Sequence, residues 1–413
     1  MELYARVYQN LVERRDRVIN GLFNSIPLGF TRFSEELPGI EQKTIYHVTA
    51  NTKVGKTQIS DYLFLYTPFF FALKNKEKVR LKIFYFTLEM SKEQKYMQFM
   101  CHLIFILSKG AIRVTPKDLR SVDASNPLSQ DILDILATDA YKEYFKFFEE
   151  TVVFIDNVKN PFGIYKFMRN YAKTHGTQHT KIVKFTDENT GEVTEQEVDD
   201  WYEPYDPEEY VICTIDHLAL LSPENGGNVR DAMVKFSSDY AITLRNKHKY
   251  ILDIVIQQAA AQESLENFKN SKLKPSLDGY GDAKIVSRDA DVIIGLFSPF
   301  RFAIPVYENY DITKFKDNIR FMEIIAGREG GGGTVCPLLF DGGTNFFSEL
   351  PLPNDHQGIL QSLELVNRIR NGGIILRSGF VNFLYKKGDY YTPNILKPVV
   401  HSYRKKLLKN LFK

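Results

Sequence analysis

The stretch YHVTANTKVGKTQISDY (46–62) decides the interpretation of this chain. A phosphate-binding loop reads Gly-x-x-x-x-Gly-Lys-Ser/Thr and joins a β-strand to an α-helix. The residues before the loop (43–50) alternate as a strand does, and those after it (57–78) read as a helix. Over 50–57 the frame lacks only its opening glycine, and it reads Ala50, Asn51, Thr52, Lys53, Val54, Gly55, Lys56 and Thr57.

The residue types in this frame suit a polyphosphate. Backbone N–H groups of the loop and of the following helix N-terminus would face the phosphates, and Gly55 lets the backbone pass close to them. Lys56 would place its ammonium on the β- and γ-phosphates, and Thr57 would bring its hydroxyl to Mg²⁺. Ala50 adds a single methyl group where the glycine is missing. The alternative is an ordinary turn that contains Gly-Lys-Thr.

Composition places the chain among ordinary soluble globular proteins. It has 413 residues, of which 44% are hydrophobic and 25% charged, and its net charge of +2 excludes a general polycation. Its cysteines, Cys101, Cys213 and Cys336, are far apart, which fits a reducing cytoplasm and argues against a disulfide framework or a four-cysteine zinc site. The start of the chain is charged and lacks a secretory signal, and the apolar run 62–73 is too short to span a membrane.

Apolar strands that alternate with helical patterns indicate an α/β fold. Near-continuous apolar strands of this kind form a mostly parallel sheet with helices on both faces. The last strands follow one another without helices, which predicts an antiparallel edge. The helices include 91–110 and 230–249, and the strands after the loop are expected at 79–90, 150–157, 209–221, 250–258, 289–297, 321–328 and 334–342.

Three segments lie outside this alternation. Residues 1–25 carry apolar side chains three or four positions apart, which predicts an amphipathic helix. Residues 175–210 are acidic and contain the hairpin signal DENTGEV (187–193), so we expect a surface insertion there. The main domain is then 26–350, and a C-terminal extension, 351–413, ends in a basic amphipathic stretch.

Acidic residues that follow strands could complete a nucleotide site. Asp216 ends an apolar strand, where a carboxylate could hold Mg²⁺ through water opposite the loop. Asp156 ends another strand and is the competing candidate. Glu89 follows the strand at 79–90, where a carboxylate could activate the water that attacks the γ-phosphate. The alternative for Glu89 is a surface glutamate favoured by a helix N-terminus.

Beside the phosphate loop, several segments follow one another in a recognisable order: IPLGFTRFSEELPGI (26–40), FTLEMSKEQ (86–94), CTIDHLALL (213–221), IVIQQAAAQESLE (254–266), RDADVIIGLF (288–297) and IIAGREGGGGTVCPLLFDGGTNFFSEL (324–350). Taken in order, these motifs resemble the motor domain of DnaB-type replicative helicases, which belong to the RecA-like ATPase superfamily. The resemblance covers residues 25–350 and implies a RecA-like P-loop NTPase core that binds ATP with Mg²⁺.

The resemblance also implies roles for single residues. It makes Gln258 the sensor of the γ-phosphate and Arg328 a finger that reaches the nucleotide of the neighbouring subunit. The lysine that usually accompanies the finger falls on Ala326, and the Asn and Arg that usually follow the glutamine are Ala260 and Ala261. One cation would therefore be missing at the subunit boundary.

The function that this resemblance implies is ATP-dependent DNA unwinding in replication. ATP hydrolysis between the subunits of a ring, expected to be a hexamer, would drive translocation on single-stranded DNA.

The loop expected to bind DNA follows Gln258, and its candidate contacts are Lys269, Lys272, Lys274, Gly281 and Lys284. Tyr280 is a further candidate, which could stack on a base. The alternative is that this segment is a solvated loop with ordinary lysines.

Residues 1–25 resemble the linker helix of that family, which packs on the neighbouring subunit, and leave no room for its helical N-terminal domain. We therefore expect a helicase of the bacterial cytoplasm, of phage or mobile-element origin, with a primase or a loader as its candidate partner. Two alternatives stay open. One is a RecA-like recombination or strand-exchange ATPase, which would share Lys56, Glu89 and Asp216. The other is a degenerate relative with a structural role.

Overall fold

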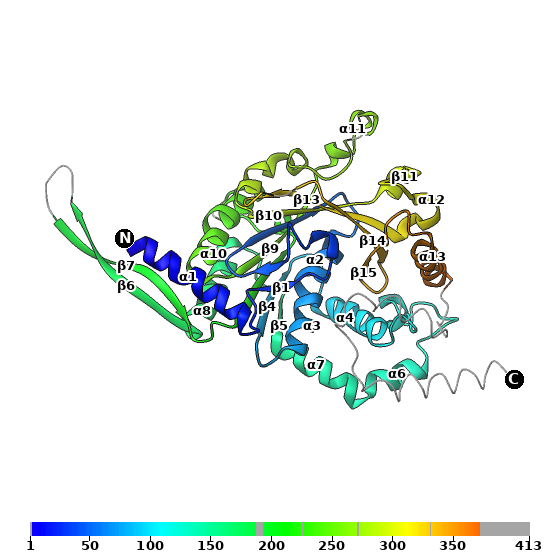
Figure 1. Cartoon of the computed structure of the whole chain (residues 1–413), viewed down its shortest axis with the longest axis horizontal. Helices are drawn as coiled ribbons and strands as arrows, with labels where there is room; N and C mark the ends of the chain where they lie inside the picture. The colour runs from blue at the N-terminus through cyan, green and yellow to red at the C-terminus, as the bar shows by residue number, and fades with distance from the viewer. Residues whose placement is uncertain (1, 187–192, 225, 271, 331, 372–413) are drawn as a thin grey trace.

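A nine-stranded sheet forms the centre of the computed structural model, which describes residues 2–186, 193–224, 226–270, 272–330 and 332–371 (Figure 1). The strand order is β15-β14-β13-β10-β3-β9-β8-β4-β5. The strands are β3 (Ile45–Ala50), β4 (Arg80–Thr87), β5 (Val152–Ile155), β8 (Glu209–Asp216), β9 (Ile251–Gln257), β10 (Val292–Phe297), β13 (Ile319–Gly327), β14 (Val335–Asp341) and β15 (Phe346–Glu349).

The strands from β10 to β5 run parallel, and β13, β14 and β15 extend the sheet in antiparallel pairs. The expected α/β fold, with a mostly parallel sheet and an antiparallel edge, is confirmed. A parallel sheet is buried on both faces, and every residue of β3 is buried. Along β4, Ile83 and Tyr85 enter the hydrophobic core on one face, whereas Phe84 and Phe86 enter the core on the other.

Helices on the first face pack through an aromatic cluster. Phe69, Phe99 and Phe148 are fully buried there, and Phe99 stacks on Phe148 with 3.9 Å between ring centroids. The first three helical elements form one continuous run, 56–74, so the helix expected at 57–78 ends earlier than predicted. The elements of this face are α2 (Lys56–Ser60), the π-helical η2 (Asp61–Tyr66), α3 (Thr67–Lys74), α4 (Lys92–Leu107), α6 (Gln130–Ala137) and α7 (Asp139–Thr151).

A second group of helices covers the opposite face of the sheet (Figure 1). Met168, Phe236 and Leu244 are buried here against strand residues such as Ile254. The group consists of α8 (Pro161–Thr174), α9 (Val229–Val234), the π-helical η4 (Lys235–Ala241), α10 (Ile242–His248) and the 3₁₀ segment η6 (Asp278–Arg288). At the antiparallel edge, α12 (Ile312–Phe315) and α13 (His356–Arg370) complete a smaller core.

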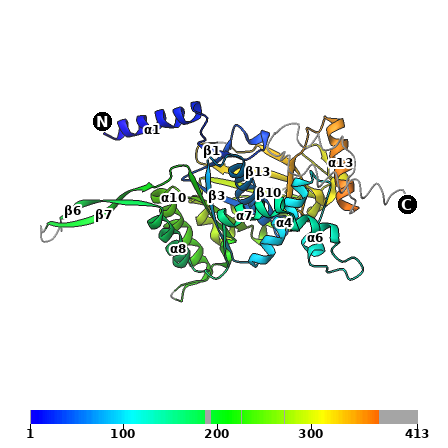
Figure 2. The ribbon, with the colours of Figure 1, turned by 90° about the horizontal axis from the view of Figure 1, so that it is seen from below.

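Two elements project from the same side of the body, as Figures 1 and 2 show. One is α1 (Glu2–Ile19), whose C-terminal end is tied down by the Arg17–Glu208 ion pair. The other is the antiparallel hairpin of β6 (Gly176–Thr186) and β7 (Val193–Pro204), which forms in the segment expected to be an insertion. Its turn, 187–192, and the basic ending of the chain lie outside the described residues.

The remaining elements are short and connect the layers. No helix in the described ranges is both long and apolar enough to cross a lipid bilayer. The connecting elements are β1 (Ser25–Pro27), η1 (Thr31–Phe33), β2 (Gly39–Glu41), α5 (Pro116–Leu119), η3 (Leu218–Leu220), η5 (Ala260–Glu263), α11 (Leu265–Lys269), η7 (Pro299–Phe302), β11 (Val306–Tyr307), β12 (Tyr310–Asp311) and η8 (Lys316–Asn318).

Candidate nucleotide site

The phosphate-loop frame bends around two left-handed residues. Ala50 is still part of β3, where it is buried and lies opposite Gln257 and Leu296. Its methyl group therefore occupies a strand position and does not obstruct the bend. Lys53 has φ 61° and Gly55 has φ 109°. A side chain at Gly55 would be strained by this backbone and would lie 3.3 Å from the Gln58 side-chain oxygen, so glycine is required there.

Buried polar groups line this loop. The Asn51 side chain is fully buried, and neither of its polar atoms has a hydrogen-bond partner in the part of the chain that the structure describes. A buried amide without partners is costly, so this side chain fits a loop that binds a polar ligand. Thr52 Oγ1 accepts a 2.9 Å hydrogen bond from Gln257 Nε2. The residues present thus fit a phosphate-bearing nucleotide.

Thr57 and Asp216 meet at the start of the helix that follows the loop. Thr57 Oγ1 donates a 2.9 Å hydrogen bond to Asp216 Oδ1, and Asp216 is fully buried at the end of β8. The competing Asp156 lies beyond the edge strand β5, with Lys92 Nζ at 3.4 Å from its carboxylate. Within the described ranges no group of three His, Cys, Asp or Glu side chains could hold a metal by itself. Thr57 with Asp216 therefore fits a Mg²⁺ ion that is held largely by nucleotide phosphates.

Charges of both signs surround His217, the residue after Asp216. Burial lowers the pKa of His217, and the Lys56 ammonium lowers it further, while the carboxylates of Asp216 and Glu89 raise it in part. Glu89 itself is exposed in the turn between β4 and α4, where Ser91 forms the expected capping box with Gln94. The charges of Lys56, Asp216 and Glu89 thus all act on the His217 imidazole.

The two glutamines at the end of β9 face different neighbours. Gln258, the expected γ-phosphate sensor, is 2% exposed, and its Nε2 donates to Thr49 Oγ1 at 2.9 Å and to the Ser276 carbonyl at 3.2 Å. The Gln257 side chain instead reaches Thr52 in the phosphate loop. The structure therefore places Gln257, which was not predicted as a site residue, next to the loop, whereas Gln258 bonds to Thr49 in β3 and to Ser276 in the segment that follows β9.

Arg328 lies at the end of the sheet where the parallel strands begin, whereas the phosphate loop lies at the end where they finish. It follows β13, which is antiparallel to β10, and its Nη1 is 3.2 Å from Asp291 Oδ1 at the start of β10. Its Nη2 also donates to the carbonyls of Arg288 and Asp289. The guanidinium is about half exposed, with 48% of the side chain accessible, so it is available to a second molecule and does not face the phosphate loop of its own chain.

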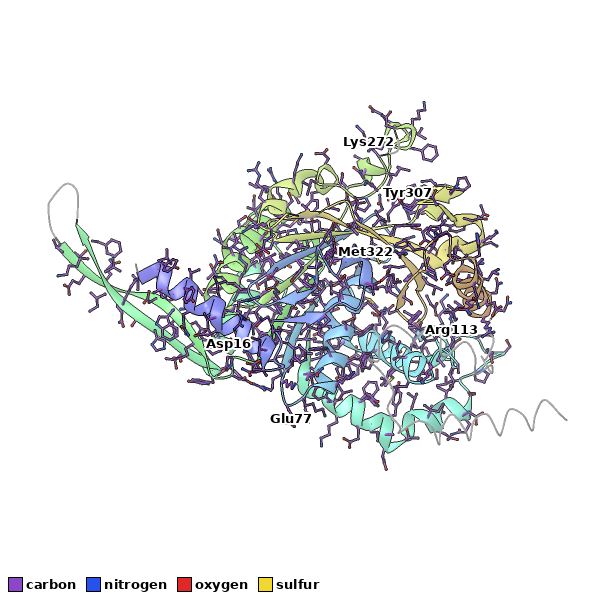
Figure 3. The ribbon with its side chains drawn as sticks, in the orientation of Figure 1. Asp16, Glu77, Arg113, Lys272, Tyr307 and Met322 are labelled. Carbon is purple, nitrogen blue, oxygen red and sulfur yellow. The ribbon has the colours of Figure 1, made fainter. Side chains whose placement is uncertain are left out.

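The expected DNA-binding segment forms short helices that project beyond the sheet, and Lys272 lies near its outer end (Figure 3). Lys274 and Lys284 form ion pairs with Glu323 and Asp278. Gly281 has φ 55° and ψ −131°, a conformation that only glycine adopts readily.

Lys269 and Lys272 are exposed. Tyr280, weighed as a base-stacking residue, is 3% exposed, and its hydroxyl lies 3.3 Å from His47 Nδ1. In this structure its ring therefore packs in the core and is not presented for stacking on a base.

The sequence reading missed a buried charge network behind Asp216. Lys95 of α4 is 1% exposed and contacts Asp61, Tyr85 and Asp216. Burial raises the pKa of Asp216, but Lys95 and the hydroxyls of Thr57 and Tyr85 outweigh burial, and the net pKa is lowered. Burial likewise lowers the pKa of Lys95, and its carboxylate neighbours raise it overall. A lysine in a helix gives no local signal of such burial.

Arg320 was not predicted as a site residue either, because the local sequence gives no signal that this charged side chain is buried. It is 2% exposed on β13, and its Nε donates a 2.7 Å hydrogen bond to the carbonyl of Val54 in the phosphate loop. Its Nη groups bond to the Asp317 carbonyl and carboxylate. The antiparallel edge of the sheet thus supports the loop directly.

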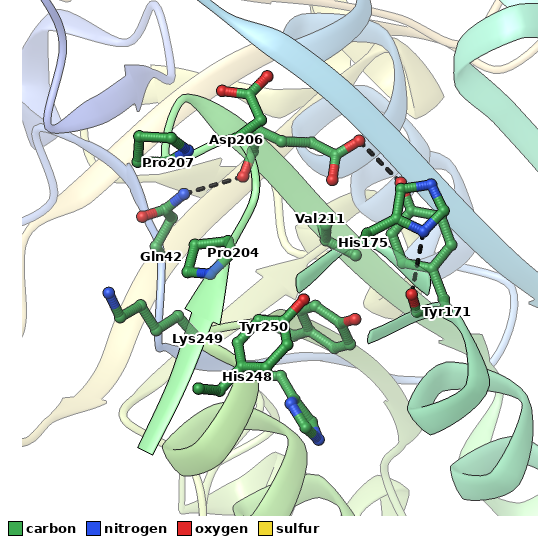
Figure 4. Close-up of a pocket in the computed structure, with 12 residues that line it drawn as sticks. Gln42, Tyr171, His175, Pro204, Asp206, Pro207, Val211, His248, Lys249 and Tyr250 are labelled. Carbon is green, nitrogen blue, oxygen red and sulfur yellow. Dashed lines mark hydrogen bonds between the residues drawn. The ribbon is translucent and has the colours of Figure 1, made fainter. Parts of the chain in front are cut away.

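A hollow of about 40 Å³ lies far from this site, at the root of the hairpin (Figure 4). It is lined by residues such as Tyr171, Tyr202 and His248, and by Glu209 and Val211 at the start of β8. Asp216 is at the other end of that strand. A space of this size has room for water but not for a nucleotide, so it is not the catalytic centre.

Comparison with solved structures identifies the fold. Structures that align with this chain include a DnaB-like replicative helicase, studied with primase, at TM-score 0.55 and 14% identity, covering 82% of this chain and 65% of that one. They also include a separate ATPase domain at TM-score 0.55 and 15% identity, covering 85% of this chain and 98% of that domain. A KaiC-like protein from Pyrococcus horikoshii aligns at TM-score 0.39 and 14% identity, covering 79% and 99% of the two chains.

The first two matches define a RecA-like ATPase fold. More particularly, the fold is that of the motor domain of DnaB-like helicases, as the sequence resemblance implied. This chain spans 65% of the length of the DnaB-like helicase and nearly all of the separate ATPase domain. No model of a known protein family matches the sequence, and no curated protein matches it.

Proposed function

We propose that this protein is an ATP-dependent DNA helicase of the DnaB type, which couples ATP hydrolysis to translocation on single-stranded DNA during replication. The observation that carries the proposal is the 2.9 Å hydrogen bond between Thr57 and Asp216. It joins the phosphate loop to the acidic strand end, as a metal-dependent nucleotide site requires. The similarity to DnaB-like motor domains supports the same conclusion at the level of the fold.

Different residues of this chain would bind the phosphates, hold the metal and orient the attacking water. Lys56 and the loop N–H groups would bind the phosphates, and Thr57 with Asp216 would hold Mg²⁺, which neutralises charge on the β- and γ-phosphates. Glu89 would orient and polarise the attacking water. Arg328 would act on the nucleotide of the adjacent subunit, because it is remote from its own loop.

A ring of subunits, which we propose to be a hexamer, is supported by α1. Its N-terminal part stands away from the body, and Leu3, Val7 and Leu11 each expose more than half of their surface. Apolar side chains grouped on a projecting helix are typical of a surface that packs on a partner. A primase or a helicase loader remains the candidate external partner, as the resemblance implies.

The test is unwinding of a forked DNA duplex, together with DNA-stimulated ATP hydrolysis, by wild type and Lys56→Ala. We expect both activities in the wild type and neither in the variant, because the loop loses its ammonium. Lys166→Ala is the control, since Lys166 is an exposed lysine of α8 remote from the loop.

Other outcomes would favour the alternatives. ATP hydrolysis with strand exchange but without unwinding would favour a recombination ATPase. A wild type that binds DNA or a partner but hydrolyses no ATP would favour a structural role. Unchanged hydrolysis in Lys56→Ala would refute the site.

A further inference from the structure

A buried cation lies directly behind Asp216. Lys95 Nζ is 3.0 Å from each carboxylate oxygen of Asp61, 2.6 Å from the Tyr85 hydroxyl and 3.3 Å from Asp216 Oδ2. Lys95 and both carboxylates are at most 1% exposed. Such a network gives no dependable gain in stability, because desolvating the charges offsets their attraction. Its position therefore needs another explanation.

The two oxygens of Asp216 have separate partners. Oδ1 accepts the hydrogen bond from Thr57, whereas Oδ2 lies 3.1 Å from the Tyr85 hydroxyl and 3.3 Å from Lys95. Partners on both oxygens prevent the carboxylate from turning about its Cβ–Cγ bond. Oδ1 is consequently held on the side of the phosphate loop.

Asp61 limits how strongly Lys95 acts on Asp216. The ammonium makes two hydrogen bonds to Asp61 but only one longer contact to Asp216. Without Asp61, the whole charge of Lys95 would act on Asp216 and compete with a metal ion. The network also links three parts of the site, since Asp61 follows the phosphate loop, Asp216 ends β8, and Lys95 belongs to the helix that follows Glu89.

We propose that Lys95 is a positioning residue of the nucleotide site: with Tyr85 it fixes Oδ2 of Asp216, so that Oδ1 and Thr57 face a metal–nucleotide complex, while Asp61 balances its charge. The inference rests on the proposed function, because it assumes that Asp216 serves a metal bound with nucleotide. Lys95 itself touches neither nucleotide nor metal.

The test compares nucleotide binding with and without Mg²⁺ and needs no turnover. A fluorescent ATP analogue is titrated in Mg²⁺ and in EDTA, and the ratio of the two affinities is measured for wild type, Asp61→Leu/Lys95→Met and Asp61→Asn. The double variant removes the Lys95 ammonium together with the Asp61 carboxylate, so that Asp61 is not left as an unpaired buried ion, as it would be in Lys95→Met. Thermal unfolding confirms that each variant is folded.

We expect the Mg²⁺/EDTA affinity ratio of the double variant to fall about tenfold or more, as is usual when partners that orient metal ligands are removed. Its affinity in EDTA should be unchanged, because the phosphate loop is intact. Asp61→Asn should lower the ratio as well, since Lys95 then acts on Asp216 alone. A purely structural role for Lys95 would change both affinities equally.

A double variant with the wild-type ratio would overturn the inference and leave the proposed function standing. A wild type that binds the analogue equally well in Mg²⁺ and EDTA would also overturn it. A wild type that binds no nucleotide in either condition would overturn the proposed function, and the inference with it.

Discussion

Arg328 Nη1 lies 3.2 Å from Asp291 Oδ1, at the end of the sheet where the parallel strands begin. Arg245 Nη1 contacts the same oxygen at 2.9 Å. The phosphate loop follows the other end of β3, a strand of 6 residues, so a distance of roughly 20 Å separates the guanidinium from its own loop. The proposed role of Arg328 in catalysis therefore requires a nucleotide that is bound to another subunit.

Arg328→Ala should impair hydrolysis and leave nucleotide binding largely intact. Comparable fingers contribute about 10³–10⁵ in rate, and the fold should persist because Arg245 still neutralises Asp291. The measurement is kcat for ATP beside the affinity of a fluorescent analogue. Loss of binding with kcat retained would count against a finger that acts between subunits.

Mixing subunits tests whether the finger acts across an interface. Arg328→Ala and Lys56→Ala proteins should each be inactive, but mixed rings contain interfaces with an intact Lys56 on one side and an intact Arg328 on the other. We expect partial recovery of hydrolysis in the mixture. If hydrolysis stays at the background level although mixed rings form, the finger does not act in this way.

Lys269 and Lys272 should carry more of the DNA affinity than Lys274. Lys274 is held by Glu323, whereas neither of the other two has a carboxylate within ion-pair distance in the described ranges. Replacing both by alanine should lower the affinity for single-stranded DNA and reduce the slope of log K against log salt by about 1–2. Binding measured at several salt concentrations checks this. If Lys274→Ala lowered the DNA affinity as much as the other two replacements, the Lys274–Glu323 ion pair would not persist when DNA binds.

Asp253 should make stability fall as pH rises. Burial raises the pKa of Asp253 to about 7, although Ser60 and Thr214 donate hydrogen bonds that oppose this. Between pH about 4 and 7 the folded protein keeps a proton that the unfolded chain has released, so the free energy of unfolding decreases across that window and stays lower above it. Asp253→Asn cannot ionise and should remove this decrease.

Urea unfolding at several pH values within and above that window provides the measurement for Asp253. Asp239→Asn is the matched control, because Asp239 is exposed on η4 with 60% of its side chain accessible. If wild type and Asp253→Asn show the same pH dependence, the Asp253 carboxyl does not carry the effect.

Arg320→Met should loosen the phosphate loop. The Val54 carbonyl would lose its bond from Nε, and leaving a buried acceptor unpaired costs about 1–3 kcal/mol. We expect a lower melting temperature and weaker nucleotide binding. Asp317→Ala should lower stability as well, because it leaves the buried Arg320 guanidinium without its carboxylate partner, but it keeps the bond from Nε to Val54 and should affect nucleotide binding less. Nucleotide affinity unchanged in Arg320→Met would show that the loop keeps its shape without this bond.

Most of the fold was predictable because its signals are local. The alternation of apolar strands with helices indicated the mostly parallel sheet, and Gly55, Lys56 and Thr57 marked the phosphate loop between β3 and α2. The missing glycine at Ala50 is tolerated because that residue still belongs to the strand. Asp216 was already favoured over Asp156 from the sequence, and the strand order supports that choice, because it places β8 near the loop and β5 at the edge.

The sequence by itself determined the elements and the phosphate-loop frame, because period, turn residues and backbone conformation are encoded within a few consecutive residues. Only the tertiary structure decided that Gln257 reaches the loop, that Arg320 supports it and that Lys95 is buried beside Asp216. These contacts join segments far apart in the chain, such as Thr57 and Asp216, which are separated by 159 positions. The burial of a charge depends on which elements pack around it, and that packing follows from the order of strands in the sheet.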